Sequence, residues 1–202
     1  MTYRLAVSGL RCGRNERTLF APIDFVAGDG DIVRIVGDNG VGKSTLLRTL
    51  AGLLSPLSGT IEWRVDDNES TPPLTLIEHE NALSQVLSPV ENLTLLLRLS
   101  RQAGRVDEAM IVDTLETLGL RRVAHQPTHT LSAGQRRRVT LARLWLAAPK
   151  VWLLDEPGAA LDKAARTCMA ERIAQLAGAG AVIIYTTHEH MALCDTHCVT
   201  LG

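Results

Sequence analysis

Apolar residues along the chain fall into short runs that predict β-strands, separated by polar or glycine-rich turns. The runs are YRLAVSGL (3–10), LFAPIDFV (19–26), the second half of GDGDIVRIVG (28–37), GTIEWRV (59–65) and LTLI (74–77). Two later runs, KVWLLDEP (150–157) and AVIIYTTH (181–188), are apolar almost without alternation. Such continuous runs are typical of parallel strands that are buried on both faces.

Helical spacing of apolar residues occupies the segments between these strands. KSTLLRTLAGLL (43–54) places five leucines on one face and is followed by Pro56. Residues 90–119 are predicted to be helical with a break near Gly104, and Gly119 stands at a predicted C-cap position. Two further helices are expected over 132–148, before Pro149, and over 162–178.

Strands that alternate with helices predict an α/β fold with a parallel sheet and with sites at the carboxyl edge of that sheet. The helix-rich middle, about 82–148, interrupts the alternation, so we expect an inserted helical subdomain. Residues 1–81 and 149–202 then form the core of a single domain, whose length of 202 residues is ordinary.

The overall charge excludes several partners. There are 21 Lys and Arg against 22 Asp and Glu, a formal net charge of −1, so no global field attracts nucleic acid or an anionic membrane.

The N-terminal MTYRLAVSGL lacks the pattern of a secretory signal, and no apolar stretch reaches the roughly 18 residues of a membrane span. We therefore expect a soluble, cytoplasmic chain.

The four cysteines lack CxxC spacing, so disulfides are not expected in a reducing compartment; they are Cys12, Cys168, Cys194 and Cys198. HEHMALCDTHC (188–198) gathers His190, Cys194, His197 and Cys198, residue types that bind zinc or haem. The apolar residues among them equally fit ordinary packing, and the sequence favours the packing interpretation.

A phosphate-binding loop is the strongest motif. GDNGVGKST matches GxxxxGK[ST] between a predicted strand and a predicted helix, the context that this motif requires. The glycines allow backbone amides to face phosphate oxygens, Lys43 adds positive charge, and Ser44 offers a hydroxyl to magnesium with Thr45 beside it. The nine residues of the loop are Gly37, Asp38, Asn39, Gly40, Val41, Gly42, Lys43, Ser44 and Thr45.

Two carboxylates complete a hydrolytic site. VWLLDEP ends a buried strand at Asp155, where it can hold magnesium, and Glu156 follows directly. Glu156 can act as a general base or position a water for attack on a γ-phosphate. His188 ends the last buried strand, from where it can reach a γ-phosphate oxygen and orient Glu156.

The segment LSAGQRRRV (131–139) allows two interpretations. Ser132 and Gln135 fit a capping box that starts a helix. Gly134 in that first turn costs about 0.5–1 kcal/mol relative to alanine, and close approach of the backbone to a ligand would offset this cost.

In this order, GDNGVGKST, LSAGQ, VWLLDEP, ALD (160–162) and His188 resemble the nucleotide-binding domain of ABC transporters, over nearly the whole chain. The resemblance implies the P-loop NTPase fold with an N-terminal antiparallel β region, a parallel-sheet core and an inserted helical subdomain. It also implies hydrolysis of ATP with Mg²⁺. Two subunits would sandwich two nucleotides, with Ser132, Gly134, Gln135 and Asp162 contacting in trans the ATP of the opposite subunit.

Two positions depart from the family pattern. In HENALSQVLSPVENL (79–93), Glu80 stands where the family has a glutamine that ligates magnesium; its carboxylate can still ligate the ion but adds negative charge. The family stacks adenine on an aromatic residue near the N-terminus, whereas CGRNERTLF (12–20) offers Arg14 for stacking on the base. A solvated turn arginine is an equally good interpretation of Arg14.

Within the family, LSAGQRRRVTLARLWL (131–146) and CGRNERTLF are similar to the ATP-binding subunits of the haem exporter of cytochrome c maturation. That resemblance implies a hydrophobic membrane permease of the CcmB type as partner, at the cytoplasmic face of the bacterial inner membrane. The helical subdomain would dock this permease. Another importer or exporter fits the same motifs; a non-transport ABC ATPase or a phosphate-loop kinase fits less well, because a kinase leaves LSAGQ and His188 unexplained.

Overall fold

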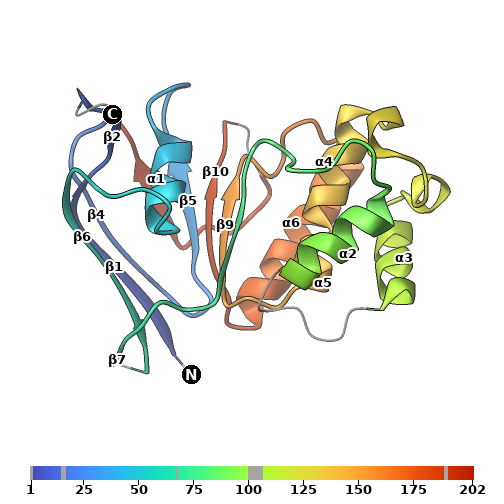
Figure 1. Cartoon of the computed structure of the whole chain (residues 1–202). Helices are drawn as coiled ribbons and strands as arrows, with labels where there is room; N and C mark the ends of the chain where they lie inside the picture. Colours follow the sequence, from blue (N-terminus) through green and yellow to red (C-terminus); the bar gives the residue numbers. More distant parts are fainter. Residues whose placement is uncertain (1, 15–16, 67, 100–106, 189–190) are drawn as a thin grey trace. The chain divides into compact units, whose positions relative to one another are not determined.

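The computed structural model describes residues 2–14, 17–66, 68–99, 107–188 and 191–202. The chain forms two compact units (Figure 1). The core unit comprises Met1–Glu78, Pro149–Pro157 and Ile173–Gly202, and the helical unit comprises His79–Ala148 and Gly158–Arg172. The inserted segment therefore begins close to the predicted residue 82, and the helical unit also includes Gly158–Arg172, which the sequence interpretation assigned to the core.

Two sheets build the core unit. The antiparallel sheet has the order β4 (Ile23–Gly28), β1 (Tyr3–Arg11), β6 (Ser58–Val65), β7 (Asn68–Glu69). The parallel sheet has the order β11 (His197–Thr200), β5 (Ile32–Val36), β10 (Val182–Thr186), β9 (Val151–Asp155), β8 (Leu74–Ile77). A two-stranded ribbon, β2 (Gly13–Arg14) with β3 (Arg17–Thr18), lies between β1 and β4 in sequence.

Helix α1 (Lys43–Leu50) lies between these sheets in Figure 1 and shares one apolar core with them. Leu46 and Leu47 are fully buried against residues of both sheets, including Leu5 of β1 and Ile35 of β5. Strands β9 and β10 are buried at every position, as their continuous apolar runs predicted. This packing fixes the carboxyl ends of β5, β9 and β10 along one edge of a rigid sheet.

The predicted helix over 43–54 is four residues too long. α1 ends at Leu50, and Gly52 adopts a left-handed backbone with φ 74°. Leu53 and Leu54 therefore leave the apolar face and are 65% and 43% exposed. Helix-like spacing of leucines continued past the point where glycine ended the helix.

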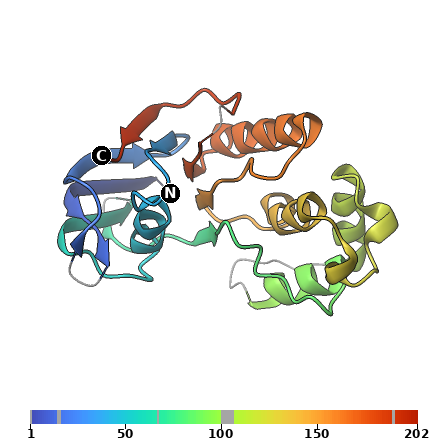
Figure 2. The ribbon, with the colours of Figure 1, turned by 90° about the horizontal axis from the view of Figure 1, so that it is seen from above.

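The helical unit contains α2 (Pro89–Leu99), α3 (Glu108–Thr117), α4 (Ala133–Leu141) and α5 (Arg143–Leu146), with short 3₁₀ turns at Arg121–Val123 and Thr128–Thr130. Figure 2 shows α2, α3 and α4 gathered in one bundle. The predicted break near Gly104 lies outside the described residues, whereas Gly119 has the positive φ, 69°, expected after the end of α3. The helix predicted over 132–148 is divided at Ala142, and Ala147, two residues before Pro149, is already extended.

Helix α6 (Lys163–Gly178) runs from the helical unit into the core unit, within the range predicted for it. The edge strand β11 was not predicted, because its four residues are mostly exposed and carry no apolar run. Strand β4 begins at Ile23, four residues after the start of the predicted run, directly after Pro22, which cannot donate a backbone hydrogen bond. Among the described residues, no helix has the length and apolarity needed to cross a membrane.

Candidate nucleotide-binding and hydrolytic site

The phosphate-binding loop connects β5 to α1, as its motif predicted. Gly42 stands before the first turn of α1 with φ 117°, a conformation that glycine adopts without strain. A β-carbon on Gly37 would lie 2.7 Å from the backbone oxygen of Leu201, so the start of the loop has no room for a side chain. These two glycines allow the loop to pass closely against the end of the sheet before α1 begins.

Lys43 and Ser44 lie at the first turn of α1. The Lys43 side chain is nearly buried, and its Nζ donates to the backbone oxygens of Gly37 (2.7 Å) and Asp38 (3.0 Å). Its ammonium group is thereby held across the mouth of the loop. Ser44 Oγ donates to Oδ2 of Asp155, 2.6 Å away, which joins the loop to the end of β9.

Asp155 is almost fully buried, and one threonine connects it to Glu156. Thr186 Oγ1, at the end of β10, donates to Oδ1 of Asp155 (2.6 Å) and accepts from the backbone N–H of Glu156 (3.0 Å). Glu156 itself has φ 47°, a left-handed conformation that costs a non-glycine residue roughly 1–3 kcal/mol. Strain of this kind is found where the surrounding structure fixes a functional side chain.

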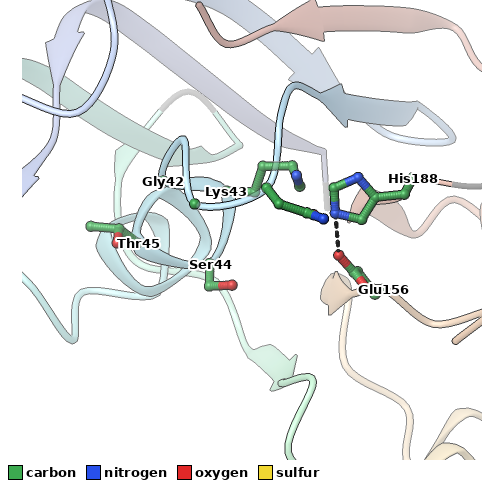
Figure 3. Close-up of a pocket in the computed structure, with 8 residues that line it drawn as sticks. Gly42, Lys43, Ser44, Thr45, Glu156 and His188 are labelled. Carbon is green, nitrogen blue, oxygen red and sulfur yellow. Dashed lines mark ion pairs between the residues drawn. The ribbon is translucent and has the colours of Figure 1, made fainter.

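Glu156 and His188 point toward each other across the site (Figure 3), with Nε2 of His188 2.7 Å from Oε1 of Glu156. Both lie at the carboxyl ends of neighbouring strands, β9 and β10. They line one pocket together with the loop; its lining residues are Asn39, Gly40, Gly42, Lys43, Ser44, Thr45, Glu156 and His188. The structure thus brings the loop, Asp155, Glu156 and His188 together, as we expected from their positions at strand ends.

A partly buried polar network holds Asp195 beside the parallel sheet. Tyr185 Oη donates to Oδ1 of Asp195 (2.6 Å), and Oδ2 of Asp195 lies 2.9 Å from Nε of Arg34 on β5. Burial, together with the bond to Asp195, raises the pKa of Tyr185 above its ordinary value, which favours the protonated hydroxyl that donates to Asp195. The network ties Asp195 to two strands of the parallel sheet.

The LSAGQ segment lies in the helical unit and begins α4. Ser132 Oγ accepts from the N–H of Gln135 (3.2 Å), and Gln135 Oε1 accepts from the N–H of Ser132 (2.8 Å), so the predicted capping box is present. A β-carbon on Gly134 would lie 2.8 Å from the backbone oxygen of Ala160. The backbone oxygen of Ala160, just before Asp162, therefore leaves no room for a side chain at Gly134. This contact within the chain explains why the first turn of α4 contains a glycine in spite of its cost.

The three arginines that follow donate to backbone oxygens within the helical unit. Arg136 Nη1 bonds to Leu131 O, the buried Arg137 to His79 O (3.3 Å), and Arg138 to Leu118 O (2.9 Å). They hold the start of α4, the segment around residue 79 and the end of α3. These bonds give the basic run a structural role within the helical unit.

The remaining predicted residues lie elsewhere. Asp162 caps α6 through a bond from Ala165 N to Oδ1 (2.8 Å). Glu80 is exposed in the helical unit, and the loop around it is held by Arg137 and by the bond from Thr140 Oγ1 to Asn81 O (3.0 Å). Arg14 belongs to β2 and pairs with Arg17 in the backbone register. The in-trans, magnesium and adenine roles of these residues stay predictions.

The cysteine and histidine cluster near the C-terminus does not form a metal site among the described residues, where no three His, Cys, Asp or Glu side chains gather in suitable positions. His190 lies outside the described residues. Cys194, His197 and Cys198 are exposed, and His197 lies 3.8 Å from Asp31. Cys12 is buried in the core, and all four cysteines are free.

Two functional candidates were missed by the sequence interpretation. Thr186 is a β-branched residue in a buried strand, which ordinary strand propensity explains fully. Ala160 belongs to the turn before Asp162 and has φ 61°. Only the doubled threonine in YTTH, at the carboxyl end of a strand, was a signal for the first of them.

Known proteins that are similar to this chain are ATP-binding proteins, in agreement with the geometry of the site. The family profile described as ABC transporter matches residues 20–159. A cytochrome c biogenesis ATP-binding export protein, CcmA, of Pseudomonas putida (strain GB-1) is 43% identical over 193 residues, covering 93% of this chain and 90% of the relative. The CcmA protein of Cupriavidus necator is 40% identical, covering 91% and 82%. The solved structure of a putative ABC transporter ATP-binding protein from Pyrococcus furiosus superposes with a TM-score of 0.82 at 24% identity, covering 96% of both chains.

Proposed function

Because the chain belongs to the ABC transporter family of ATP-binding proteins, and within it to the cytochrome c biogenesis ATP-binding export proteins, we propose that it hydrolyses ATP for a membrane complex that serves haem delivery in cytochrome c maturation. The observation that carries the hydrolytic part is the 2.7 Å contact between His188 and Glu156 in the same pocket as the phosphate-binding loop. The haem-related part rests on the similarity to the cytochrome c biogenesis export proteins of Pseudomonas putida and Cupriavidus necator.

The loop is proposed to bind the ATP phosphates. Its backbone amides and the N-terminus of α1 present partial positive charge, and Lys43 adds a full charge at the γ end. In the structure, Lys43 bonds to the backbone oxygens of Gly37 and Asp38, which phosphate oxygens would replace as acceptors. Arg14 is proposed to stack on the base at the other end of the nucleotide.

The donor set beside the loop fits a magnesium ion. Ser44 Oγ and Oδ2 of Asp155 are hard oxygen ligands that already meet at 2.6 Å, and Asp155 is buried where a positive ion would balance its charge. These two residues would hold the ion directly or through water, with Glu80 as a further proposed ligand. When bound, the ion neutralises charge on the phosphate oxygens.

Glu156 is proposed to position the attacking water and to take its proton. Its backbone is fixed by Thr186, and its carboxylate meets His188, which can also donate to a γ-phosphate oxygen. In-line phosphoryl transfer asks little more of a protein than this positioning and the neutralisation of charge. The reaction converts ATP and water to ADP and phosphate.

We propose that two chains share each nucleotide. Ser132, Gly134 and Gln135 would contact the γ-phosphate bound to the opposite chain, with Asp162 at the junction. Such an assembly has two-fold symmetry and self-complementary surfaces. The capping box occupies the N–H groups of Ser132 and Gln135, while the N-terminus of α4 as a whole carries the partial positive charge of a helix start, which suits an anion.

The membrane partner is proposed to be a hydrophobic permease of the CcmB type, at the cytoplasmic face of the bacterial inner membrane, and this chain would reach the membrane only through it. The near-zero net charge agrees with the lack of a nucleic-acid partner.

The function is tested in the host by deleting the chain and restoring wild-type, Lys43→Ala or Glu156→Gln versions. We expect wild type alone to restore covalent haem staining of c-type cytochromes, while b-type haem spectra remain unchanged in all strains. Affinity capture of the wild-type chain from membranes should recover a multi-spanning subunit with haem-handling maturation proteins. Normal c-type cytochromes in the deletion strain, or capture of an unrelated permease, would refute the haem assignment while leaving ATP hydrolysis in place.

A further inference from the structure

We propose that Thr186 is a positioning residue that sets the geometry of both acidic groups of the hydrolytic site, an inference that rests on the proposed roles of Asp155 and Glu156. Its side chain is fully buried at the end of β10 and is not among the residues that line the pocket. It therefore acts through the two acids and not by touching the nucleotide.

The direction of the hydrogen bonds at Thr186 is determined by its partners. A hydroxyl has one proton to donate. The backbone N–H of Glu156 can only donate, so Thr186 Oγ1 accepts there at 3.0 Å. Its own proton is directed to Oδ1 of Asp155 at 2.6 Å. One hydroxyl therefore joins the side chain of Asp155 to the backbone of Glu156.

The first consequence concerns the orientation of the Asp155 carboxylate. With Oδ1 bonded to Thr186, the other oxygen, Oδ2, faces Ser44 Oγ at 2.6 Å. Rotation of the carboxylate would break the short bond to Thr186. Thr186 thus fixes the orientation of the Asp155 carboxylate, so that one of its oxygens faces the phosphate-binding loop, where magnesium is proposed to bind.

The second consequence concerns the strained backbone of Glu156. Its φ of 47° is unfavourable for a residue with a β-carbon, and such a conformation persists only where the surroundings fix it. The bond from its N–H to Thr186 is one such restraint, and the resulting direction of the side chain brings Oε1 to His188. β10 ends at Thr186 and His188 follows by two residues, so the end of one strand supplies both the hydroxyl and the histidine that fix Glu156.

The test compares three variants of the full chain. Thr186→Val keeps the β-branched shape and removes the hydroxyl, and Thr186→Ser keeps the hydroxyl. Thr49→Val removes a buried hydroxyl from α1 that bonds to the backbone oxygen of Thr45 (2.8 Å) and to the Cys12 thiol, away from both acids. We expect Thr186→Val to lower kcat by about 10- to 100-fold, the range for losing a bond to a charged group. Its affinity for ATP without Mg²⁺ should stay within about threefold, because the loop is untouched.

A second measurement distinguishes positioning from loss of structure. Thr186→Val should require a several-fold higher Mg²⁺ concentration for half-maximal turnover, whereas Thr186→Ser and Thr49→Val should match wild type. Equal kcat and Mg²⁺ dependence in Thr186→Val and wild type would overturn the inference. So would equal loss in Thr186→Val and Thr186→Ser, or a loss of Mg²⁺-free ATP binding as large as the loss of turnover. An inactive wild-type chain would instead count against the proposed hydrolytic function itself.

Discussion

The backbone oxygen of Ala160 lies against Gly134 so closely that a β-carbon on the glycine would be 2.8 Å from it. Ala160 has a left-handed backbone, φ 61°, and precedes Asp162, the residue that caps α6. The start of α4 and the turn before α6 are therefore fitted to each other inside the helical unit. The backbone of Ala160 therefore requires a glycine at position 134, independently of any contact between Gly134 and a nucleotide.

Gly134→Ala should consequently be destabilising although alanine is the better helix former. We expect a loss of roughly 1–3 kcal/mol in the free energy of unfolding, the usual cost of inserting a methyl group into a packed site. Urea denaturation measures it. The matched control is Ala133→Gly, one residue earlier on the exposed side, which should cost no more than about 1 kcal/mol through helix propensity. Equal stability of Gly134→Ala and wild type would show that the turn moves aside freely.

Removal of Glu156 or His188 should separate hydrolysis from binding. Glu156→Gln keeps the shape of the side chain but cannot take a proton, so we expect kcat to fall by about 10²- to 10⁴-fold with ATP affinity retained. His188→Ala loses the 2.7 Å contact that orients Glu156, so its kcat should also fall while ATP affinity is retained. Steady-state turnover and fluorescent-nucleotide titration measure the two quantities.

The double variant is informative because residues that act as a unit are not additive. If His188 works by orienting Glu156, His188→Ala added to Glu156→Gln should lower kcat little further. If the fold loss of kcat in the double variant equals the product of the two single losses, the two residues act independently. Glu156→Gln should also retain ATP and accumulate as a dimer in gel filtration with ATP and Mg²⁺.

Much of the hydrolytic site could be predicted because its signals are local. The loop lies within nine consecutive residues, and Asp155 and His188 are each marked by the end of an apolar run. Parallel strands place their carboxyl ends along one edge, so these segments had to meet once the α/β pattern was recognised. The Ser132 capping box needed only a spacing of three residues.

Contacts between distant segments could not be predicted in this way. The bonds of Thr186 depend on the register of β10 beside β9, where Thr186 stands opposite Asp155. The fit of Ala160 to Gly134 depends on backbone conformation alone, since both residues are small and neither has a polar side chain. The end of α1 was misjudged because the spacing of Leu53 and Leu54 imitated helical periodicity beyond Gly52.

Glu80 offers a test of an unusual residue at the proposed magnesium site. A carboxylate there adds negative charge beside the γ-phosphate, where the family has a neutral amide. Glu80→Gln should therefore raise kcat by roughly 3- to 10-fold, corresponding to about 0.7–1.4 kcal/mol, and shift the preference between Mg²⁺ and Mn²⁺. Glu171→Gln, which removes an exposed carboxylate from α6 in the same unit, is the matched control. Unchanged turnover in Glu80→Gln would contradict the interpretation that the charge of Glu80 slows hydrolysis.

The start of α2 predicts a pH dependence of stability in the helical unit. Oε2 of Glu91 accepts from the N–H and from Oγ of Ser88, both at 2.8 Å, and these bonds, with the backbone bond first, lower the pKa of Glu91. A pKa that is lower in the folded chain than in the unfolded chain means that the carboxylate stabilises the fold fully above the unfolded value, which is about 4.3 for glutamate. This contribution is lost as the pH falls through the lowered folded value.

We therefore expect the difference in unfolding free energy between wild type and Glu91→Gln to be constant near neutral pH and to shrink toward zero in acid. Urea denaturation at several pH values between about 7 and about 3 measures it. Glu108→Gln provides the comparison, because Glu108 lies in the first turn of α3, where Asp107 supplies the cap. A difference that persists unchanged at the acid end would mean that the stabilisation of α2 by Glu91 does not depend on the ionisation of its carboxyl group.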